Sequence, residues 1–389
     1  MHTGRLVFAQ LLDLVPAHEL RRCVDRYRGN FHCRRFTCHD QFLTLAFAQL
    51  TGCESLRQIQ TGLGALEGHL YHAGLRARPC RSTLADANEN RDWRIWADFA
   101  QVLIAQARRL YARESFGLEL DETAYAFDSS TIDLCLNLFP WAAFRRHKAA
   151  IKLHTLMDLR GSIPCFVLIT HGKVSDVTSL DAWWLEAGAF YVFDRGYIDF
   201  KRLYRFTLAA SFFVTRAKRN LDFRVCASSP VDKRTGLRCD QRIRLQGPLS
   251  SQRYPDTLRR VGYHDAETDK RLVFMTNNFV LDALLITRLY HSRWQIELFF
   301  KWIKQHLKIK AFYGTSENAV KTQIWVAISV YVLVALLKKE LRIERSLGEI
   351  LQVLDFTLFQ NMPILQALSI PAPAISTPDA RKQLSLFTF

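Results

Sequence analysis

Two aspartates stand where the sequence pattern could bring carboxylates together. Asp128 closes the apolar segment that begins at Tyr125, and Asp194 closes the apolar segment 190–193. If both segments are neighbouring strands, the carboxylates should lie side by side at one sheet edge. Two carboxylates there repel each other unless a positive charge lies between them, and hard divalent cations with oxygen ligands usually supply it. For either aspartate alone, capping of the following turn is the favoured interpretation.

A third acidic residue, Glu297, lies in a segment whose pattern predicts one helix from Leu284 to Lys310. Tyr290, Arg293 and Lys304 share this segment with it, and at 100° per residue all four project within about 60° of one another. An apolar arc beside them should bury the helix against the sheet, and it consists of Ile296, Phe299, Phe300, Ile303 and Leu307. The helix can therefore bring Glu297 toward the two aspartates.

The surroundings of Glu297 favour a catalytic role over a structural one. An exposed ion pair between Arg293 and Glu297, worth ~0.3 kcal/mol, is the structural alternative. However, a carboxylate beside an apolar arc can hold a metal ion while neighbouring cations contact phosphates. Those cations are Arg293, Lys301, Lys304, Lys308 and Lys310. The pattern therefore indicates a metal-dependent reaction on a phosphate-containing substrate.

Composition agrees with a nucleic-acid partner. The 389 residues include 53 Lys and Arg against 37 Asp and Glu, which gives a formal net charge of +16, and a basic protein favours a polyanionic partner. The positive charge is concentrated, since the segment from Arg216 to Arg260 contains twelve Lys and Arg but four Asp and Glu. With 49% hydrophobic residues, the chain should bury a sizeable core in two or three packed units.

The cysteines and the apolar runs indicate a protein of the reducing cytoplasm. Nine cysteines are scattered without paired CxxC spacing, which fits that compartment. A zinc site at Cys33 and Cys38 with His32 and His39 is not favoured, because no second half-site follows. The longest apolar run, Val326–Leu337, is shorter than the ~20 residues that cross a bilayer. It should form a core helix or strand, and we expect no membrane partner.

The first third of the chain has the periodicity of helices, and we expect a helical domain over residues 1–117. One apolar stripe follows Trp96 at helical spacing. Residues 41–50 and 55–66 predict two short helices joined near Gly52, which is compatible with either a helix-turn-helix or an ordinary bundle. A further helix should begin at a cap on Thr83.

The remainder alternates between strands and helices. We expect a first part of a catalytic core over 118–200, a β-rich insertion over 201–284, a second core part with C-terminal helices over 285–368, and an extended tail over 369–389. The core should contain an antiparallel meander of strands at 125–128, 151–159 and 163–170, a helix at 177–187 and a strand at 190–193. The insertion should contain strands at 221–226, 242–245, 258–263 and 272–277.

The chain resembles the bacterial insertion-sequence transposases of the DDE class, insertion-sequence family four. Their YREK signature, Y-(2)-R-(3)-E-(6)-K, is matched at every spacing by Tyr290, Arg293, Glu297 and Lys304. The segments Ala126-Phe-Asp-Ser-Ser-Thr and Val192-Phe-Asp-Arg-Gly-Tyr are similar to the family's two aspartate motifs. The resemblance extends from about the first ten residues to about Gln366, as expected of a complete protein.

The resemblance implies an α/β fold and a set of site residues. A ribonuclease H-like core, a mixed sheet with flanking helices, would be interrupted by a mostly β insertion and preceded by an all-α domain. Asp128, Asp194 and Glu297 would be catalytic and would bind two Mg²⁺ ions, with Mn²⁺ able to substitute and Asp128 bridging both ions. The resemblance also gives Tyr290, Arg293 and Lys304 as DNA-binding residues that contact terminal phosphates.

The implied activity is cut-and-paste DNA transposition through a hairpin intermediate. In relatives, a tryptophan of the insertion stacks on a flipped base, but this sequence has no tryptophan between Trp184 and Trp294. Tyr254 or Tyr263 could take that role. The implied partner is double-stranded DNA, both transposon ends and target, in the bacterial cytoplasm at the nucleoid.

Inverted repeats would be recognised by the N-terminal domain, while the basic insertion would add contacts to the DNA backbone. A homodimer on paired ends is expected, and helices between Val320 and Leu358 could form its contact, although a helix buried within one chain would have the same pattern. Two other functions fit the sequence. One is a non-catalytic or domesticated DNA-binding relative, and the other is a ribonuclease H-like nuclease without strand transfer.

Overall fold

Helices form the N-terminal part of the chain, as the sequence predicts. The computed structural model describes residues 5–114, 116–146, 148–306 and 312–369. The N-terminal helices are α1 (Val7–Leu12), α2 (Ala17–Arg26), α3 (Cys38–Leu50), α4 (Leu56–Ala65), α5 (Arg81–Asn90) and α6 (Arg94–Tyr111). Thr37 and Asp40 form a capping box at α3, and Ser55 caps α4. The expected helix pair around Gly52 is thereby confirmed.

The predicted start of α5 at Thr83 is wrong by two residues. The helix begins at Arg81, after Cys80 at the N-cap position. The backbone N–H of Leu84 already donates to the carbonyl oxygen of Cys80 at 3.1 Å, so the first helical turn is closed before a cap at Thr83 could act.

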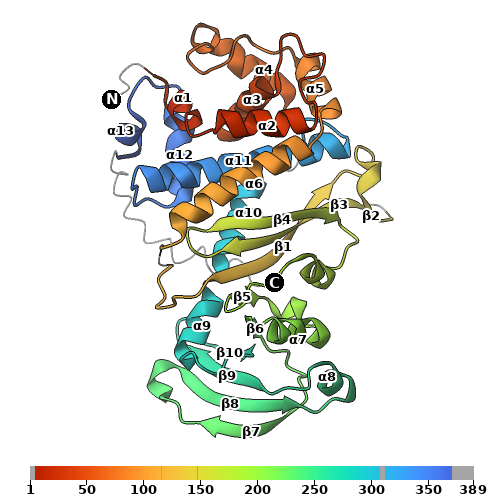
Figure 1. Cartoon of the computed structure of the whole chain (residues 1–389), viewed down its shortest axis with the longest axis vertical. Helices are drawn as coiled ribbons and strands as arrows, with labels where there is room; N and C mark the ends of the chain where they lie inside the picture. Colours follow the sequence, from red (N-terminus) through yellow and green to blue (C-terminus); the bar gives the residue numbers. More distant parts are fainter. Residues whose placement is uncertain (1–4, 115, 147, 307–311, 370–389) are drawn as a thin grey trace.

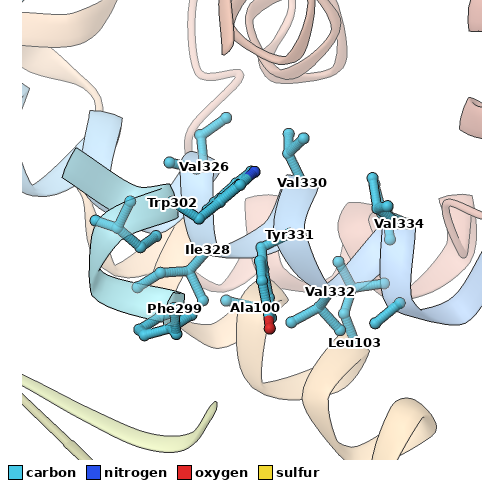
Figure 2. Close-up of a cluster of buried hydrophobic side chains, with 14 of the residues drawn as sticks. Ala100, Leu103, Phe299, Trp302, Val326, Ile328, Val330, Tyr331, Val332 and Val334 are labelled. Carbon is cyan, nitrogen blue, oxygen red and sulfur yellow. The ribbon is translucent and has the colours of Figure 1, made fainter. Parts of the chain in front are cut away.

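One long helix, α11 (Glu317–Glu340), is the centre of the main hydrophobic core. Figure 1 shows it beside α6, in a helical layer above the sheet. In Figure 2 its valines and Tyr331 meet side chains of α6 and of α10 (Trp294–His306). The rings of Phe299 and Trp302 each lie 5.0 Å from that of Tyr331, centroid to centroid. The predicted apolar run 326–337 is thus a core helix.

Burial decides two further questions about α11. By length and composition it could span a membrane, but 94% of its most apolar window is buried inside the chain, as in the core helix of a soluble domain. The expectation that helices from Val320 to Leu358 form a dimer contact fails for α11, whose apolar side chains are already used within one chain. The helices that follow it are α12 (Leu347–Thr357) and α13 (Ile364–Ser369). The tail expected after residue 369 lies outside the described residues.

A ten-stranded mixed sheet lies below the helical layer (Figure 1). Its strands are β1 (Ala124–Leu134), β2 (Ala143–Arg145), β3 (Lys148–Asp158), β4 (Ile163–His171), β5 (Phe190–Phe193), β6 (Phe212–Arg216), β7 (Phe223–Ser229), β8 (Leu237–Leu245), β9 (Leu258–Asp265) and β10 (Lys270–Thr276). The order is β2-β3-β1-β5-β6-β10-β9-β8-β7, and β4 also pairs with β3. The fold is therefore α/β, with a helical N-terminal region and a mixed sheet.

Strand directions divide the sheet into two halves. In the inner half, β1, β3 and β4 form the expected antiparallel meander, and β5 and β6 run parallel to β1. In the outer half, β7 to β10 are antiparallel and continue the same sheet beyond β6. All four strands expected in the insertion are confirmed. Two short helices, α7 (Phe200–Leu208) and α8 (Pro248–Arg253), flank this part.

Alternating side chains bury both faces of the inner strands. Ala126, Val192 and Val214 join the core under the helical layer, while Phe127 and Phe193 join a second core with α7 on the other face. This period of two means that neighbouring residues of one strand serve opposite faces. This alternation also fixes the face of the sheet on which each polar residue after these segments lies.

Two predicted helices differ in the structure. The helix expected at 177–187 is a 3-10 helix, η3 (Asp176–Ala182), because Trp183 adopts an extended backbone and buries its ring 3.9 Å from that of Phe127. The helix expected from 284 to 310 is interrupted at Ser292 and Arg293, giving α9 (Ala283–His291) and α10. Residues 307–310 of that prediction, Leu307 included, lie outside the described residues.

Candidate active site

The strand register brings Asp128 and Asp194 to the same level. Phe127 of β1 pairs with Phe193 of β5 in a parallel ladder, so the next residue of each chain is an aspartate at the same height. Both directly follow phenylalanines that join the second core, so by alternation both face the opposite side of the sheet, toward α9 and α10. The predicted proximity of the two aspartates at one edge of the β1–β5 ladder is confirmed.

One detail of that prediction is wrong. Asp128 does not close its strand, because β1 continues to Leu134 and Asp128 pairs with Thr155 of β3. The parallel partner β5 ends at Phe193, and the chain then turns into the 3-10 helix η4 (Arg195–Tyr197). The edge that exposes Asp128 is therefore made by the short β5 and not by the end of β1.

The junction of α9 and α10 brings three signature residues to these aspartates. Tyr290 donates from its hydroxyl to Oδ1 of Asp194 at 3.3 Å. Arg293 donates from Nη1 to Oδ2 of Asp128 at 3.0 Å and from Nη2 to Oε1 of Glu297 at 2.6 Å. Although the helix is interrupted, the N–H of Arg293 bonds to the carbonyl of Tyr290, and this tight turn keeps the three side chains on one side.

Lys304 is not part of this contact network. It is exposed near the end of α10 and makes no hydrogen bond or ion pair with the rest of the described chain. The structure thus brings together five of the six predicted site residues, and the exposed Lys304 has no contact with the other five.

The site contains more negative charge than its one buried cation balances. The pKa of Asp128 is raised to about 6, mainly by burial and also by the charges of Glu297 and Asp194, while Arg293 and the N–H of Ser129 act in the opposite direction. Arg293 is mostly buried, with 18% of its side chain exposed, whereas 56% of Glu297 is exposed. The Nε of Arg293 is buried without a hydrogen-bond partner in the described part of the chain.

These residues fit a hard divalent cation by the chemistry of their ligand atoms. Carboxylate oxygens are the ligands that Mg²⁺ and Mn²⁺ prefer, and a cation would relieve the repulsion that raises the pKa of Asp128. Among the described residues, no three acidic, histidine or cysteine side chains are close enough to hold one ion. Glu297 is held by Arg293 instead, so a shared ion requires that this pair opens.

Two residues near the acids could have been found from the sequence but were missed. Tyr197 follows Asp194 in the second aspartate motif, and its hydroxyl lies 3.5 Å from Oδ1 of Asp128. Arg216 follows Thr215, which pairs with Phe193, so Asp128, Asp194 and Arg216 lie at one level on three neighbouring parallel strands. The apolar run 212–214 just before Arg216 was the available signal, although no strand was predicted there.

The two tyrosines expected to stack on a base differ in accessibility. Tyr254 is 1% exposed, and its hydroxyl lies 2.7 Å from that of Thr207. Stacking by Tyr254 would require unpacking of the second core, so this expectation is wrong. Tyr263 is half-buried and lies beside the exposed His291 and Trp294 in an open hollow.

Comparisons with known proteins agree with the geometry. Residues 119–333 match the family model described as a transposase DDE domain. Residues 3–76 match a family described as a domain of unknown function. The first match covers the acidic residues, the whole sheet and most of α11.

Individual relatives give a consistent picture. A protein named as a transposase from Sinorhizobium fredii is 33% identical over 302 residues, which are 76% of this chain and 82% of that protein. A protein from Geobacillus stearothermophilus named as the transposase of an insertion sequence element is 29% identical over 321 residues, covering 82% and 81%. A third, from Synechocystis and also named for an insertion sequence element, is 23% identical over 260 residues, covering 66% and 71%.

Proposed function

Because the chain belongs to the DDE transposases of insertion-sequence family four, we propose that it cuts the ends of an insertion sequence and joins them to target DNA. The observation that carries the proposal is the convergence of Asp128, Asp194 and Glu297 around Arg293. The order of the inner strands, with β5 and β6 parallel to β1 beyond an antiparallel meander, supports a ribonuclease H-like core.

Asp128, Asp194 and Glu297 would hold two Mg²⁺ ions, for which Mn²⁺ could substitute. Ions bound there supply charge stabilisation and an activated oxygen nucleophile in phosphodiester cleavage. Arg293 pairs with both Asp128 and Glu297 before DNA arrives. On binding, its guanidinium can turn to a terminal phosphate, together with Tyr290 and Lys304. This exchange would free both carboxylates as ligands.

A row of cations beside Asp194 would guide the DNA strand into the site. Arg195, Lys218 and Arg219 line a hollow of about 410 Å³ next to Asp194, and Arg216 lies at the level of the two aspartates. None of these four cations has an ion-pair partner in the described part of the chain. Unpaired cations that lie close together are well suited to backbone phosphates.

The outer strands offer a second contact surface for the DNA backbone. Arg224 of β7 pairs directly with Arg244 of β8, so two like charges lie on the same face of the sheet. Both are exposed. Like charges placed opposite each other destabilise a sheet, whereas an anionic ligand removes that repulsion. This surface would hold duplex DNA while the N-terminal helices recognise the inverted repeat.

The remaining steps follow from the family to which the chain belongs. The freed 3′-OH would attack the opposite strand to form a hairpin, and after reopening it would attack target DNA. Two copies of the chain would hold the two ends, in the bacterial cytoplasm. Double-stranded DNA is thus both the partner and the substrate.

The decisive experiment is cleavage of labelled DNA that carries the flanking inverted repeats, with Mg²⁺ or Mn²⁺. Wild-type protein should give hairpin and joined products, and Glu297→Gln should give none while it still binds the DNA. Glu317→Gln is a matched control, since Glu317 also lies in the first turn of a helix and pairs with a cation four residues away, Lys321. Cleavage without joining would indicate a nuclease, and binding without cleavage by wild type would indicate a non-catalytic relative.

A further inference from the structure

A chain of polar side chains lies on the face of β1 opposite to Arg293. Tyr197 lies 2.9 Å from Oγ of Ser129, and Ser129 donates to Oδ1 of Asp176 at 2.8 Å. Lys152 lies 3.1 Å from the same oxygen. Ser129 also donates its backbone N–H to Oδ1 of Asp128 at 2.8 Å. The carboxylate of Asp128 is thus connected to an acidic residue at the start of η3 that the proposed activity does not use.

The number of protons available to these side chains fixes the direction of the hydrogen bonds between them. A carboxylate accepts hydrogen bonds only, so Asp176 draws the hydroxyl proton of Ser129 toward itself. The oxygen of Ser129 is then free to accept the single proton of Tyr197. The distances agree, because the hydroxyl of Tyr197 is 2.9 Å from Ser129 but 3.5 Å from Asp128. Oδ1 of Asp128 therefore keeps a lone pair that Tyr197 does not occupy.

Asp176 is held firmly enough to impose this direction. Lys152, with 13% of its side chain exposed, also donates to the carbonyl of Val174 at 2.9 Å. The ring of His154 is fully buried, and its Nδ1 lies 3.8 Å from Asp176. Because β1 and β3 pair Ser129 with His154, the two ends of the network have a fixed separation. Lys152 thus fixes Asp176 from one side and the β1–β3 pairing fixes the serine from the other.

We propose that Asp176 is a positioning residue, which acts through Ser129 and Tyr197 to keep Oδ1 of Asp128 available to a divalent cation. This inference rests on the proposed function, in which Asp128 is a metal ligand. Partners that lie behind metal ligands set the orientation and the lone pairs of those ligands, and their loss typically weakens metal binding 10–100-fold.

The test is a titration of the purified full-length protein with Mn²⁺, in which unbound Mn²⁺ is counted by electron paramagnetic resonance. Asp176→Asn can present an amide N–H to Ser129, which turns the serine proton to Tyr197 and the tyrosine proton to Asp128. We expect Mn²⁺ binding to weaken by roughly tenfold, with DNA binding in EDTA and the denaturation temperature unchanged. Asp181→Asn, in the same 3-10 helix and paired with surface arginines, should bind Mn²⁺ like wild type.

A second pair of variants covers the case in which Asp176→Asn is unstable. Ser129→Ala removes the hydroxyl link and should weaken Mn²⁺ binding, whereas Ser129→Thr keeps the hydroxyl and should not. Equal Mn²⁺ binding by both serine variants, or wild-type binding by a folded Asp176→Asn, overturns the inference. Glu297→Gln in the same titration separates the two hypotheses, because unchanged binding there argues against the proposed function itself.

Discussion

The two halves of one sheet have opposite surfaces. In the inner half, β5 is buried throughout, and β1 and β3 are buried over most of their length. In the outer half, β7 is exposed from Arg224 to Ser229, and β8 alternates between arginines and buried leucine or isoleucine. Acidic residues converge in the inner half, whereas exposed arginines such as Arg224 and Arg244 face outward in the outer half.

This difference separates two tasks that DNA cleavage requires. Burial on both faces fixes the backbone around Asp128 and Asp194, and it keeps their carboxylates at one level. Exposed arginines with long side chains can adapt to a duplex of any sequence, since phosphate contacts carry little sequence information. The comparison predicts that substitutions in the inner half abolish DNA cleavage, while substitutions in the outer half weaken DNA binding.

The largest effect should come from the inner half. Asp194→Asn removes a negative charge without a change in size, and cleavage should fall by roughly ten-thousandfold, since metal-held charge is worth several kcal/mol and each ~1.4 kcal/mol is a factor of ten. DNA binding in EDTA should be retained. A gel assay of end cleavage measures the loss, with Asp181→Asn as the control. Substantial cleavage by Asp194→Asn would remove this residue from the active site.

A single buried arginine breaks the pattern of the outer half. Arg259 of β9 has 8% of its side chain exposed and pairs with Asp240, whose side chain is 14% exposed, at 2.7 Å. It also donates to the carbonyl of Leu281, just before α9. Arg259→Leu leaves Asp240 buried and unpaired, so the free energy of unfolding should fall by about 3 to 4 kcal/mol.

Urea denaturation measures this loss. The double variant Arg259→Leu, Asp240→Leu is the control, because removal of a whole buried ion pair is close to neutral. If the double variant were as unstable as the single one, the lost packing and not the unpaired charge would be responsible. Arg259 would then hold the sheet to α9 mainly through Leu281.

Sequence periodicity was sufficient for most of the fold. The apolar stripe of α6, the apolar run of α11 and most strands of both halves have the spacing that burial of those elements requires. Strands β2 and β6 were not predicted. The ends of individual strands and helices were harder to predict. Nothing in the sequence near Asp128 marks β1 as continuing to Leu134, because that continuation depends on pairing with β3. The break between α9 and α10 carries no proline or glycine, so a single helix was predicted there.

The acidic residues were predicted, but of their partners only the pairing of Arg293 with Glu297 was considered, and that pair is present. Asp128, Asp194 and Glu297 were found from the ends of apolar segments and from the signature spacing. Arg293 was expected to contact DNA phosphate, and the structure without DNA has it between Asp128 and Glu297. Asp176 has no pattern that connects it to Asp128, because its contact passes through Ser129 across 47 residues of sequence.

A smaller effect in the inner half should appear at acidic pH. The pKa of His154 is lowered to about 4, mainly by burial and also by the charge of Lys152, while the charge of Asp176 acts in the opposite direction. The unfolded chain therefore binds a proton near pH 6.5, before the folded chain does. The stability should fall by about 2 to 3 kcal/mol as the pH drops from 6.5 to 4.

Denaturation at several pH values tests this dependence. His154→Gln should lose much of the decline, and the exposed His72→Gln should retain it. An identical decline in His154→Gln would assign the acid sensitivity to other groups. Asp128 is not among those groups, because its raised pKa makes the folded chain bind a proton first, and it therefore adds stability as the pH falls.

The smallest effect should be on the outer edge. Removal of the opposed charges by Arg224→Gln with Arg244→Gln should weaken DNA binding and reduce the salt slope of log K by about two, since each phosphate contact contributes about 0.9. Stability should stay unchanged or rise by a few tenths of a kcal/mol as the repulsion disappears. Fluorescence anisotropy at several salt concentrations gives the slope, and Arg342→Gln beyond α11 is the control. An unchanged slope with normal cleavage would restrict the DNA path to the inner half. The cations beside Asp194 would then bind the DNA next to the acidic residues that cleave it.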